Sequence, residues 1–406
     1  MKSASSTVSA PSRMRTVERR IYCYAFVARL YFYIPVLVLH METVLGNVGV
    51  AQPSSLSLSL IAMASLGTLL AEYPSGVLAD WLGHSRTLLL AGVLQVAGLA
   101  CFLLPPSLWS LTLAQVTIGV ATAFRSGADT ALLHAHLEAE GQTARYGAAL
   151  SRLRFFNTLA IASSGMVGGL LYQYSPNLVF VLSAVSAGVG SLAVFGLGAP
   201  LLSGRRSYRQ VLAQSLGAMR SSRKVQVLIL LGGLGNPFFV FAFWVTQRYM
   251  NDAGISPMAT GVACAAISYL QAATMPLSAW FAKAPGRLRR GTYLIAGALP
   301  LSFLIVALCW EHARMSGAAV LIVVAGSHVL YKNIINVRLQ ALAPAHVRAS
   351  ILSFESWIGA LGYLVVFPTA GVLFADLGLA GAFAVLSLLI SLTLWPPLLW
   401  GHRLHA

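Results

Sequence analysis

The chain of 406 residues is 57% hydrophobic and 9% charged, so it cannot cover a water-facing surface as a soluble domain with roughly 25% charged residues does. Its net charge of +16 is spread over short segments between apolar runs, which excludes the single basic face that nucleic-acid binding requires. The cysteines, Cys23, Cys101, Cys264 and Cys309, show no CxxC spacing and indicate neither a zinc site nor a redox pair.

Apolar runs of about 20 residues, the length that crosses a bilayer, recur along the chain and predict about twelve spans. In chain order the predicted spans are 21–44, 55–79, 86–105, 108–132, 147–173, 177–199, 225–249, 257–282, 290–310, 316–341, 349–374 and 378–400. The first run is too long for the apolar region of a cleavable signal, so it is expected to be a span.

The longest internal polar stretch, 200–224, falls halfway along the chain and predicts a cytoplasmic linker. We therefore expect an all-α polytopic membrane protein with two pseudo-symmetric six-helix bundles, 21–199 and 225–400, around a central cavity. A disordered, basic cytoplasmic leader is expected at 1–20, and a cytoplasmic tail at 401–406.

Lysine and arginine gather on one side of the predicted bundle. They occupy 1–20, 200–224, 283–290 and the tail, whereas 45–54, 105–108 and 174–177 have none. The positive-inside rule then places both termini in the cytoplasm. Compact loops and the lack of targeting signals favour a multi-pass protein of a bacterial inner (plasma) membrane, and we expect a monomer.

The turn between the second and third spans carries a short motif. Its residues are Gly76, Leu78, Asp80, Gly83 and Arg86. Gly76 is expected to permit close helix packing, Asp80 to pair with a cation or a helix N-terminus, and Gly83 to permit a tight turn.

This stretch resembles the cytoplasmic signature G-x-L-a-D-r-x-G-r-[R/K] of the major facilitator superfamily. Trp81 and His84 stand where basic residues are usual. The equivalent loop at 282–290 keeps a glycine and cations but lacks the aspartate. The resemblance implies a twelve-helix bacterial transporter of the efflux type that works by alternating access.

Two antiporter signatures of that family are half present. Gln115 occupies the arginine position of the span-four pattern R-x-x-x-G, and Gly165 stands where the span-five bend has proline. These departures weaken the case for export by proton exchange without excluding that function.

Polar and aromatic side chains inside the spans supply the candidate cavity residues, because a buried ionisable group usually faces a wet cavity. The candidates for substrate contact are Arg29, Tyr33, Gln115, Asn236, Trp244, Tyr269, Lys332, Asn336, Glu355 and Trp357. Arg29 lies near mid-depth and either binds an anionic group or pairs with an acid. Arg125 and Asp129 are four residues apart, so they can pair near the cytoplasmic end of span four.

Glu355, Asp129 and Glu72 are the candidate proton carriers. Glu355 is the strongest in the second half, because desolvation favours the neutral form of a carboxylate. The alternative for Glu355 is a salt bridge to Lys332 or Arg338.

Together these features predict a secondary active transporter with a small-molecule substrate, protons as coupling ion and the lipid bilayer as surroundings. Export of a drug-like or siderophore-like metabolite is favoured; the alternative is uptake or facilitated diffusion of a nutrient or metal chelate. No HExxH, GxSxG or Walker motif occurs, so we expect no enzyme activity, cofactor, metal site or direct ATP drive.

Overall fold

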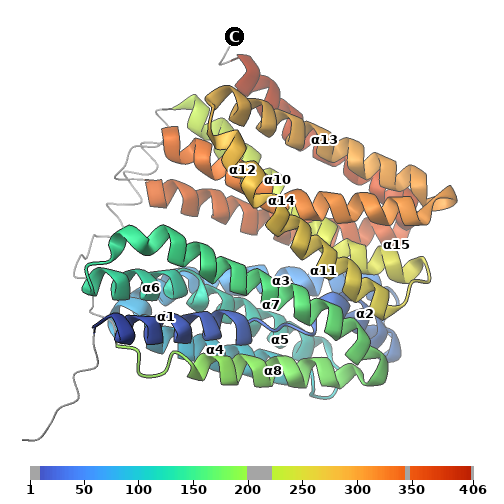
Figure 1. The fold of residues 1–406 in the computed structure, drawn as a ribbon. Coiled ribbons are helices and arrows are strands. Elements are labelled where there is room, and N and C mark those ends of the chain that lie inside the picture. Colours follow the sequence, from blue (N-terminus) through green and yellow to red (C-terminus); the bar gives the residue numbers. More distant parts are fainter. Residues whose placement is uncertain (1–9, 199–221, 343–347, 404–406) are drawn as a thin grey trace, which may run out of the picture.

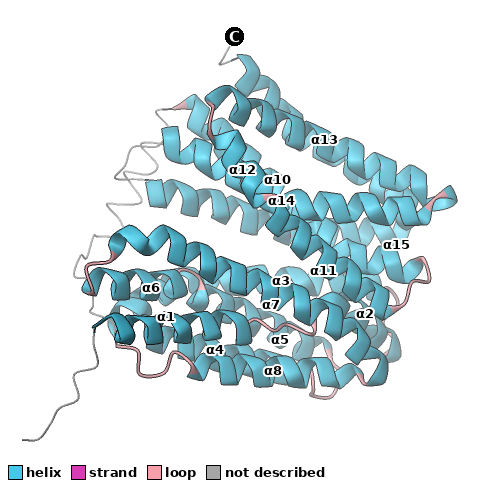
Figure 2. Cartoon of the chain, viewed as in Figure 1, coloured by secondary structure: helices cyan, strands magenta, loops and turns pink. Residues whose placement is uncertain are grey.

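The computed structural model describes residues 10–198, 222–342 and 348–403, and every regular element in these ranges is a helix (Figure 2). The predicted linker and the last residues of the chain fall mainly outside the described ranges. Within them the helices form two groups, one from each half of the chain, which lie one above the other in Figure 1.

The first group contains α1 Ala10–Val27, the 3-10 turn η1 Ile34–Val36, α2 Leu37–Asn47, α3 Pro53–Leu82, α4 His84–Cys101, α5 Leu108–Arg125, α6 Ala128–Ala139, the 3-10 turn η2 Thr143–Arg145, α7 Tyr146–Tyr174 and α8 Pro176–Leu192. The second group contains α10 Arg223–Asp252, α11 Pro257–Ala273, α12 Met275–Ala282, α13 Pro285–His312, α14 Arg314–Leu342 and α15 Arg348–Arg403.

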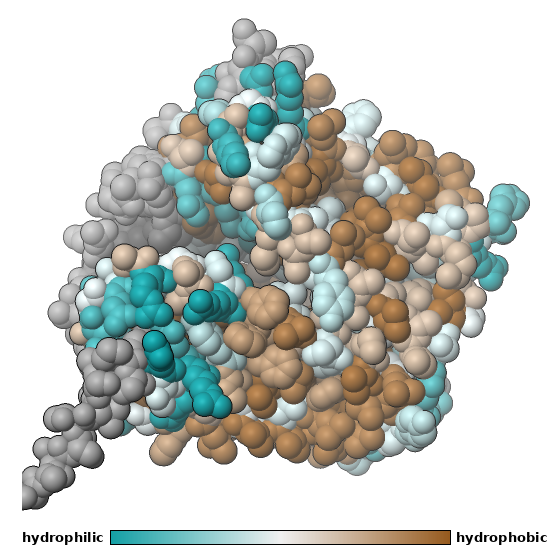
Figure 3. Space-filling view, viewed as in Figure 1, coloured by the Kyte–Doolittle hydropathy of each residue, from teal (hydrophilic) through white to brown (hydrophobic). Residues whose placement is uncertain are grey.

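The outer surface of these helices suits a bilayer. In the described residues, eight segments are long and apolar enough to cross a membrane, and Ile34–Asn47 and Pro176–Leu192 are shorter apolar helices. Large apolar side chains are exposed along α8, α13 and α15, and Figure 3 shows a mostly apolar surface over the body of the molecule. The chain is therefore a multi-pass membrane protein.

Helix α15 includes both of the last predicted spans. Gly378, with φ +66° and ψ −176°, interrupts its helical backbone. Only glycine adopts such a conformation at low cost, which explains why the chain turns there. The interruption lies at the predicted start of the last span.

Two predicted spans are broken near their middle instead of running straight. In the first, α1 ends at Val27 and regular structure resumes at Ile34. In the fourth, α5 ends at Arg125 and α6 begins at Ala128 after Gly127, whose φ is +80°. This fourth span also reaches Ala139, beyond the predicted end at 132, so its polar residues lie deeper than the sequence suggested.

The structure differs from the expectation of a disordered leader at 1–20, because helix α1 already begins at Ala10. Polar contacts fix this segment to the first group. The Arg20 side chain donates hydrogen bonds to the carbonyl oxygens of Ala193 (2.9 Å) and Phe195 (2.5 Å), and Glu18 pairs with Arg145 at 3.3 Å.

Small residues bring the helices together. α7 packs on α11 and α3 on α15, which joins the two groups. A Cβ atom added at Gly168 or Gly169 of α7 would overlap the backbone of Phe32 or Pro257. The expected close approach at Gly76 is absent in this conformation, because no atom lies within 4 Å of a Cβ added there.

Gly119→Ala should lower the melting temperature, because the new Cβ would overlap the carbonyl oxygen of Ala64 on the neighbouring helix. Overpacking of this kind costs about 1–3 kcal/mol. Gly76→Ala is the matched control and should leave the melting temperature unchanged or slightly higher, since the site is open and alanine favours helix. Thermal unfolding in detergent measures both; equal melting temperatures would contradict this packing.

Candidate functional site

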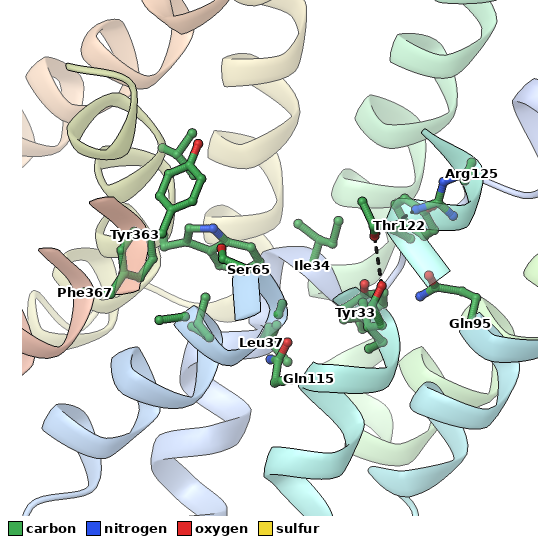
Figure 4. A pocket seen from close by; sticks show the side chains of 17 residues that line it. Tyr33, Ile34, Leu37, Ser65, Gln95, Gln115, Thr122, Arg125, Tyr363 and Phe367 are labelled. Atoms are coloured by element: carbon green, nitrogen blue, oxygen red, sulfur yellow. Dashed lines mark hydrogen bonds between the residues drawn. The ribbon is translucent and has the colours of Figure 1, made fainter. Parts of the chain in front are cut away.

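A pocket of about 260 Å³ lies between the two groups of helices (Figure 4). The first group lines it with the broken first span, α3, α4 and α5. The second group lines it with Val240 and Trp244 of α10 and with Tyr363 and Phe367 of α15. Because both groups contribute, any relative movement of the groups would reshape the pocket.

The break in the first span supplies one wall. Tyr31 and Tyr33 lie in the non-helical connection, and Ile34 opens the following turn. The Tyr33 ring stacks on Phe180 with centroids 6.0 Å apart, and Tyr31 meets Tyr33 edge to face at the same distance. These ring contacts hold the irregular backbone against the first group.

Arg125, the last residue of α5, is buried in the wall of the pocket with 8% of its surface exposed. Its guanidinium lies 5.6 Å from the centre of the Tyr31 ring, and its Nη2 donates to Thr122 Oγ1 at 3.3 Å. No described carboxylate lies within ion-pair distance of it.

The expected pairing of Arg125 with Asp129 does not form. The turn at Ser126 and Gly127 separates the two helices, so the residues do not share one helical face. Asp129 instead pairs with Arg29 across the two breaks, with Nη2 and Oδ2 3.0 Å apart. Of the two alternatives for Arg29, the structure has the pairing with an acid.

Asp129→Asn should lower the melting temperature, because it leaves the Arg29 cation without a carboxylate. The Arg29 side chain is 22% exposed and that of Asp129 is 7% exposed. We therefore expect the free energy of unfolding to fall by about 1–3 kcal/mol, less than for a fully buried pair. The double variant Arg29→Gln/Asp129→Asn removes both charges and should regain most of the loss. A double variant no more stable than Asp129→Asn would contradict this coupling.

A polar network supports the second-group wall. Asn236 on α10 donates to the Tyr363 hydroxyl at 2.5 Å, and its Oδ1 lies 2.6 Å from His328 Nε2. Tyr363 lines the pocket and Asn236 lies behind it. The predicted cavity residue Asn236 thus orients a lining residue rather than lining the pocket itself.

A second charged cluster lies on α14 and α15 of the second group, outside the pocket lining. Lys332 Nζ on α14 is 3.4 Å from Glu355 Oε2 on α15, and Glu355 is only 2% exposed. Arg338, the other suggested partner, donates instead to Thr292 Oγ1 at 2.7 Å. Glu72 of the first group lies near Lys332 and the Trp357 indole, so this cluster joins the two groups.

At the opposite end of the helices the two groups are tied together by polar contacts. Arg248 Nη1 of α10 lies 3.0 Å from Glu42 Oε1 of α2, and within α10 Arg248 Nε lies 3.4 Å from Asp252 Oδ2. Gln247 Nε2 donates to the carbonyl of Ile34 at 2.9 Å, and its Oε1 accepts from the backbone N–H of Val38 at 3.2 Å. These contacts bridge the two groups next to the pocket residue Ile34, and we refer to this end of the helices as the sealed end.

The other predicted residues are spread over the structure. Gln115 lines the pocket, as do Tyr33 and Trp244, whereas Tyr269 is 53% exposed on the outer surface of α11. Asn336 is half-buried on α14, with its Oδ1 making no hydrogen bond. Trp357 is 44% exposed.

In the signature turn, Gly83 has φ +83° and joins α3 to α4, as its expected role requires. Arg86 is exposed and Leu78 is half-buried. The side chain of Asp80 lies outside the described part, so its expected pairing stays a prediction.

Most lining residues were not among the predicted substrate contacts, including the polar residues Tyr31, Gln95, Thr122 and Arg125. For Arg125 the missing information was its depth in the helix bundle. The predicted span ended at 132, which placed Arg125 near the cytoplasmic end of the span. Gly127 was the available signal, since a glycine between Arg125 and Asp129 is typical of a helix break.

The sequence also matches a family model. The model described as Major Facilitator Superfamily matches residues 21–367. The chain belongs to the Major Facilitator Superfamily. It is a transporter and not an enzyme.

Solved transporter structures share this fold over almost their whole length. The nucleoside transporter NupG is 11% identical with a TM-score of 0.71, covering 95% of this chain and 98% of that one. A POT family transporter in complex with 5-aminolevulinic acid is 15% identical with a TM-score of 0.73, covering 95% and 96%. A bacterial homolog to the human lysosomal transporter Spinster, inward-facing and unoccupied, is 14% identical with a TM-score of 0.71, covering 97% and 98%. No curated protein sequence matches the chain.

Proposed function

We propose that this protein is a proton-coupled secondary transporter that exports a small metabolite by alternating access across a bacterial inner membrane. In this proposal the two helix groups are pseudo-symmetric six-helix bundles, and both termini are cytoplasmic. The observation that carries it is a pocket lined by both groups and sealed at one end by contacts between them. Rocking of one group against the other would open that end and close the opposite one.

The lysine and arginine distribution assigns the sealed end to the outside. The conformation is then inward-facing. In Figure 1 the ribbons of the two groups converge at the end where α2 and α10 meet and diverge toward the start of α1, and Figure 3 has a hollow between the groups on that side. One similar structure is likewise described as inward-facing.

Proton coupling fits the cluster around Lys332. Lys332 lies between Glu355 on its own helix group and Glu72 on the other. Protonation of Glu355 would remove its attraction for Lys332, and the cation would then favour Glu72 across the interface. A proton would thereby change the balance of contacts between the groups, as coupling requires.

Asp129 is a weaker candidate for the proton site, because its carboxylate is held by Arg29 and by the backbone N–H of Thr130 at 2.8 Å. The pocket volume of about 260 Å³ is just below the usual range for ligand sites, roughly 300 to 1,000 Å³. A small metabolite or drug fragment therefore fits this conformation better than a bulky siderophore or metal chelate.

Uptake or facilitated diffusion is the second candidate function, and one observation favours it. Gln115 lines the pocket where antiporters of this family carry an arginine tied to proton coupling, and its amide nitrogen lies 3.9 Å from Met41 Sδ. A neutral residue there would suit a uniporter.

Reconstituted protein in liposomes with an internal pH dye separates these functions. A pH gradient is imposed and candidate metabolites are added singly and in pools. Substrate-dependent dissipation of the gradient is the expected result. Substrate movement without proton flux would favour facilitated diffusion, and absence of substrate movement with every pool would contradict transport by this chain.

A further inference from the structure

The charge of the central pocket is the feature that indicates a substrate class. Of the 17 described residues that line the pocket, Arg125 alone is charged. Its guanidinium is shielded from water, and no described carboxylate lies within ion-pair distance of it, since the nearby Asp129 is paired with Arg29. Arg29, the nearby cation, is already paired with Asp129 and does not line the pocket. A buried cation without a direct ion pair inside a membrane protein is costly and generally marks a substrate path.

Further unsatisfied polar atoms lie in the same pocket wall. The Tyr31 hydroxyl is buried without a hydrogen-bond partner. The Gln95 amide approaches the Tyr33 hydroxyl without a well-formed hydrogen bond, so its nitrogen and oxygen are also unsatisfied. The guanidinium, the Tyr31 O–H and the Gln95 NH₂ are all donors, and three donors together match the lone pairs of a carboxylate.

The rest of the pocket is suited to an apolar group. In Figure 4, Arg125, Thr122 and Gln95 lie at one side of the pocket, while Tyr363 and Phe367 of α15 lie across from them. Trp244 and Ile34 supply further apolar wall. Aromatic faces of this kind bind the flat or apolar body of a small molecule.

We propose that the pocket binds a small organic monoanion, whose carboxylate or similar oxyanion is held by Arg125 and whose apolar body packs against the rings of α10 and α15. This substrate class rests on the proposed transport function and makes it more specific. Cations are disfavoured because the pocket offers them no carboxylate. Neutral analogues would leave the guanidinium without a counter-charge.

Binding of a matched set of probes to the purified full-length protein in detergent tests this inference. Benzoate, benzamide and benzylamine share one ring and differ in charge, and isothermal titration calorimetry measures their affinities. Benzoate should bind about tenfold tighter than benzamide, with benzylamine weakest. Arg125→Gln should weaken benzoate by about 10- to 100-fold, the usual range for losing a charge-assisted hydrogen bond, and Arg125→Lys should weaken it less.

Two controls separate binding from folding. Arg287→Gln removes an exposed cation that stacks on Trp280, neither of which lines the pocket, and benzoate affinity should not change. Arg125→Gln should melt at the same temperature as the unmodified protein or higher, because it removes a buried charge that has no carboxylate partner.

The inference is overturned if benzamide or benzylamine binds as tightly as benzoate, if Arg125→Gln leaves benzoate affinity unchanged, or if none of the three binds. The liposome experiment distinguishes these results from failure of the proposed function. A protein that moves neutral or cationic substrates would retain the function and lose the anion assignment, whereas a protein that moves nothing would lose both.

Discussion

Glu355→Gln should abolish proton-driven accumulation of substrate while leaving substrate exchange across the membrane intact. Glutamine mimics the protonated carboxyl group, so the 3.4 Å ion pair with Lys332 would be lost permanently and could no longer follow the proton gradient. We expect accumulation to fall by about tenfold or more, in line with usual coupling energies between sites. Liposomes with an imposed pH gradient measure accumulation, and counterflow without a gradient measures exchange.

A matched control for this variant is Asp376→Asn, which neutralises an exposed carboxylate near the Gly378 kink. It should leave both activities unchanged. Full gradient-driven accumulation by Glu355→Gln would remove Glu355 from the coupling role. Loss of exchange together with accumulation would instead indicate that Glu355 is needed for the fold or for substrate passage.

Arg248→Glu should open the sealed end of the pocket. It places a third acidic group beside Glu42 and Asp252 and turns an ion pair between the helix groups into a repulsion. The pair is mostly buried, with side chains 11% and 14% exposed, and breaking such a pair costs about 3–5 kcal/mol. Even half of this energy would shift the balance of conformations by about tenfold or more.

Thiol labelling measures this shift. A cysteine placed at Leu37, a pocket residue that is 2% exposed, is treated with a membrane-impermeant reagent from the Arg248 side, in a background without the native cysteines. Arg248→Glu should raise the labelling rate, and the charge swap Glu42→Arg/Arg248→Glu should return it toward the original value. An unchanged rate in Arg248→Glu, or no return in the swap, would contradict this gate.

Composition and apolar run length were enough to predict an all-α membrane protein, because a bilayer allows few ways to satisfy the backbone. Polar and aromatic residues within the predicted spans also led to three residues that line the pocket: Tyr33, Gln115 and Trp244. These predictions succeeded because such side chains in the middle of a span usually face the protein interior.

The breaks in the first and fourth spans could not be predicted in the same way. The segment 28–33 reads as part of a continuous apolar run, and its irregular backbone is held by tertiary contacts such as the stacking of Tyr33 on Phe180. Without the second break, Arg125 and Asp129 would share a helical face. The structure separates them, which leaves Arg125 in the pocket and Asp129 with Arg29.

For Glu355 the sequence left two partners open, and only three-dimensional packing distinguishes them. Lys332 and Arg338 both lie on α14, six residues apart, and therefore on different faces. Lys332 points toward α15, whereas Arg338 reaches Thr292 on α13. Helical periodicity predicts such separation between the two cations, but not which neighbouring helix each one meets.

The central claim, alternating access around the pocket, is tested most directly by paired distance measurements in one sample. Spin labels at Asn47 and Asn251, exposed ends of α2 and α10, report on the sealed end, and labels at Glu140 and Lys283 report on the opposite end. Electron–electron double resonance then follows both pairs with and without a transported substrate. Alternating access predicts opposite changes, with a longer distance at the sealed end whenever the other end shortens. Distances that stay fixed at both ends during turnover, or that lengthen together, would contradict it.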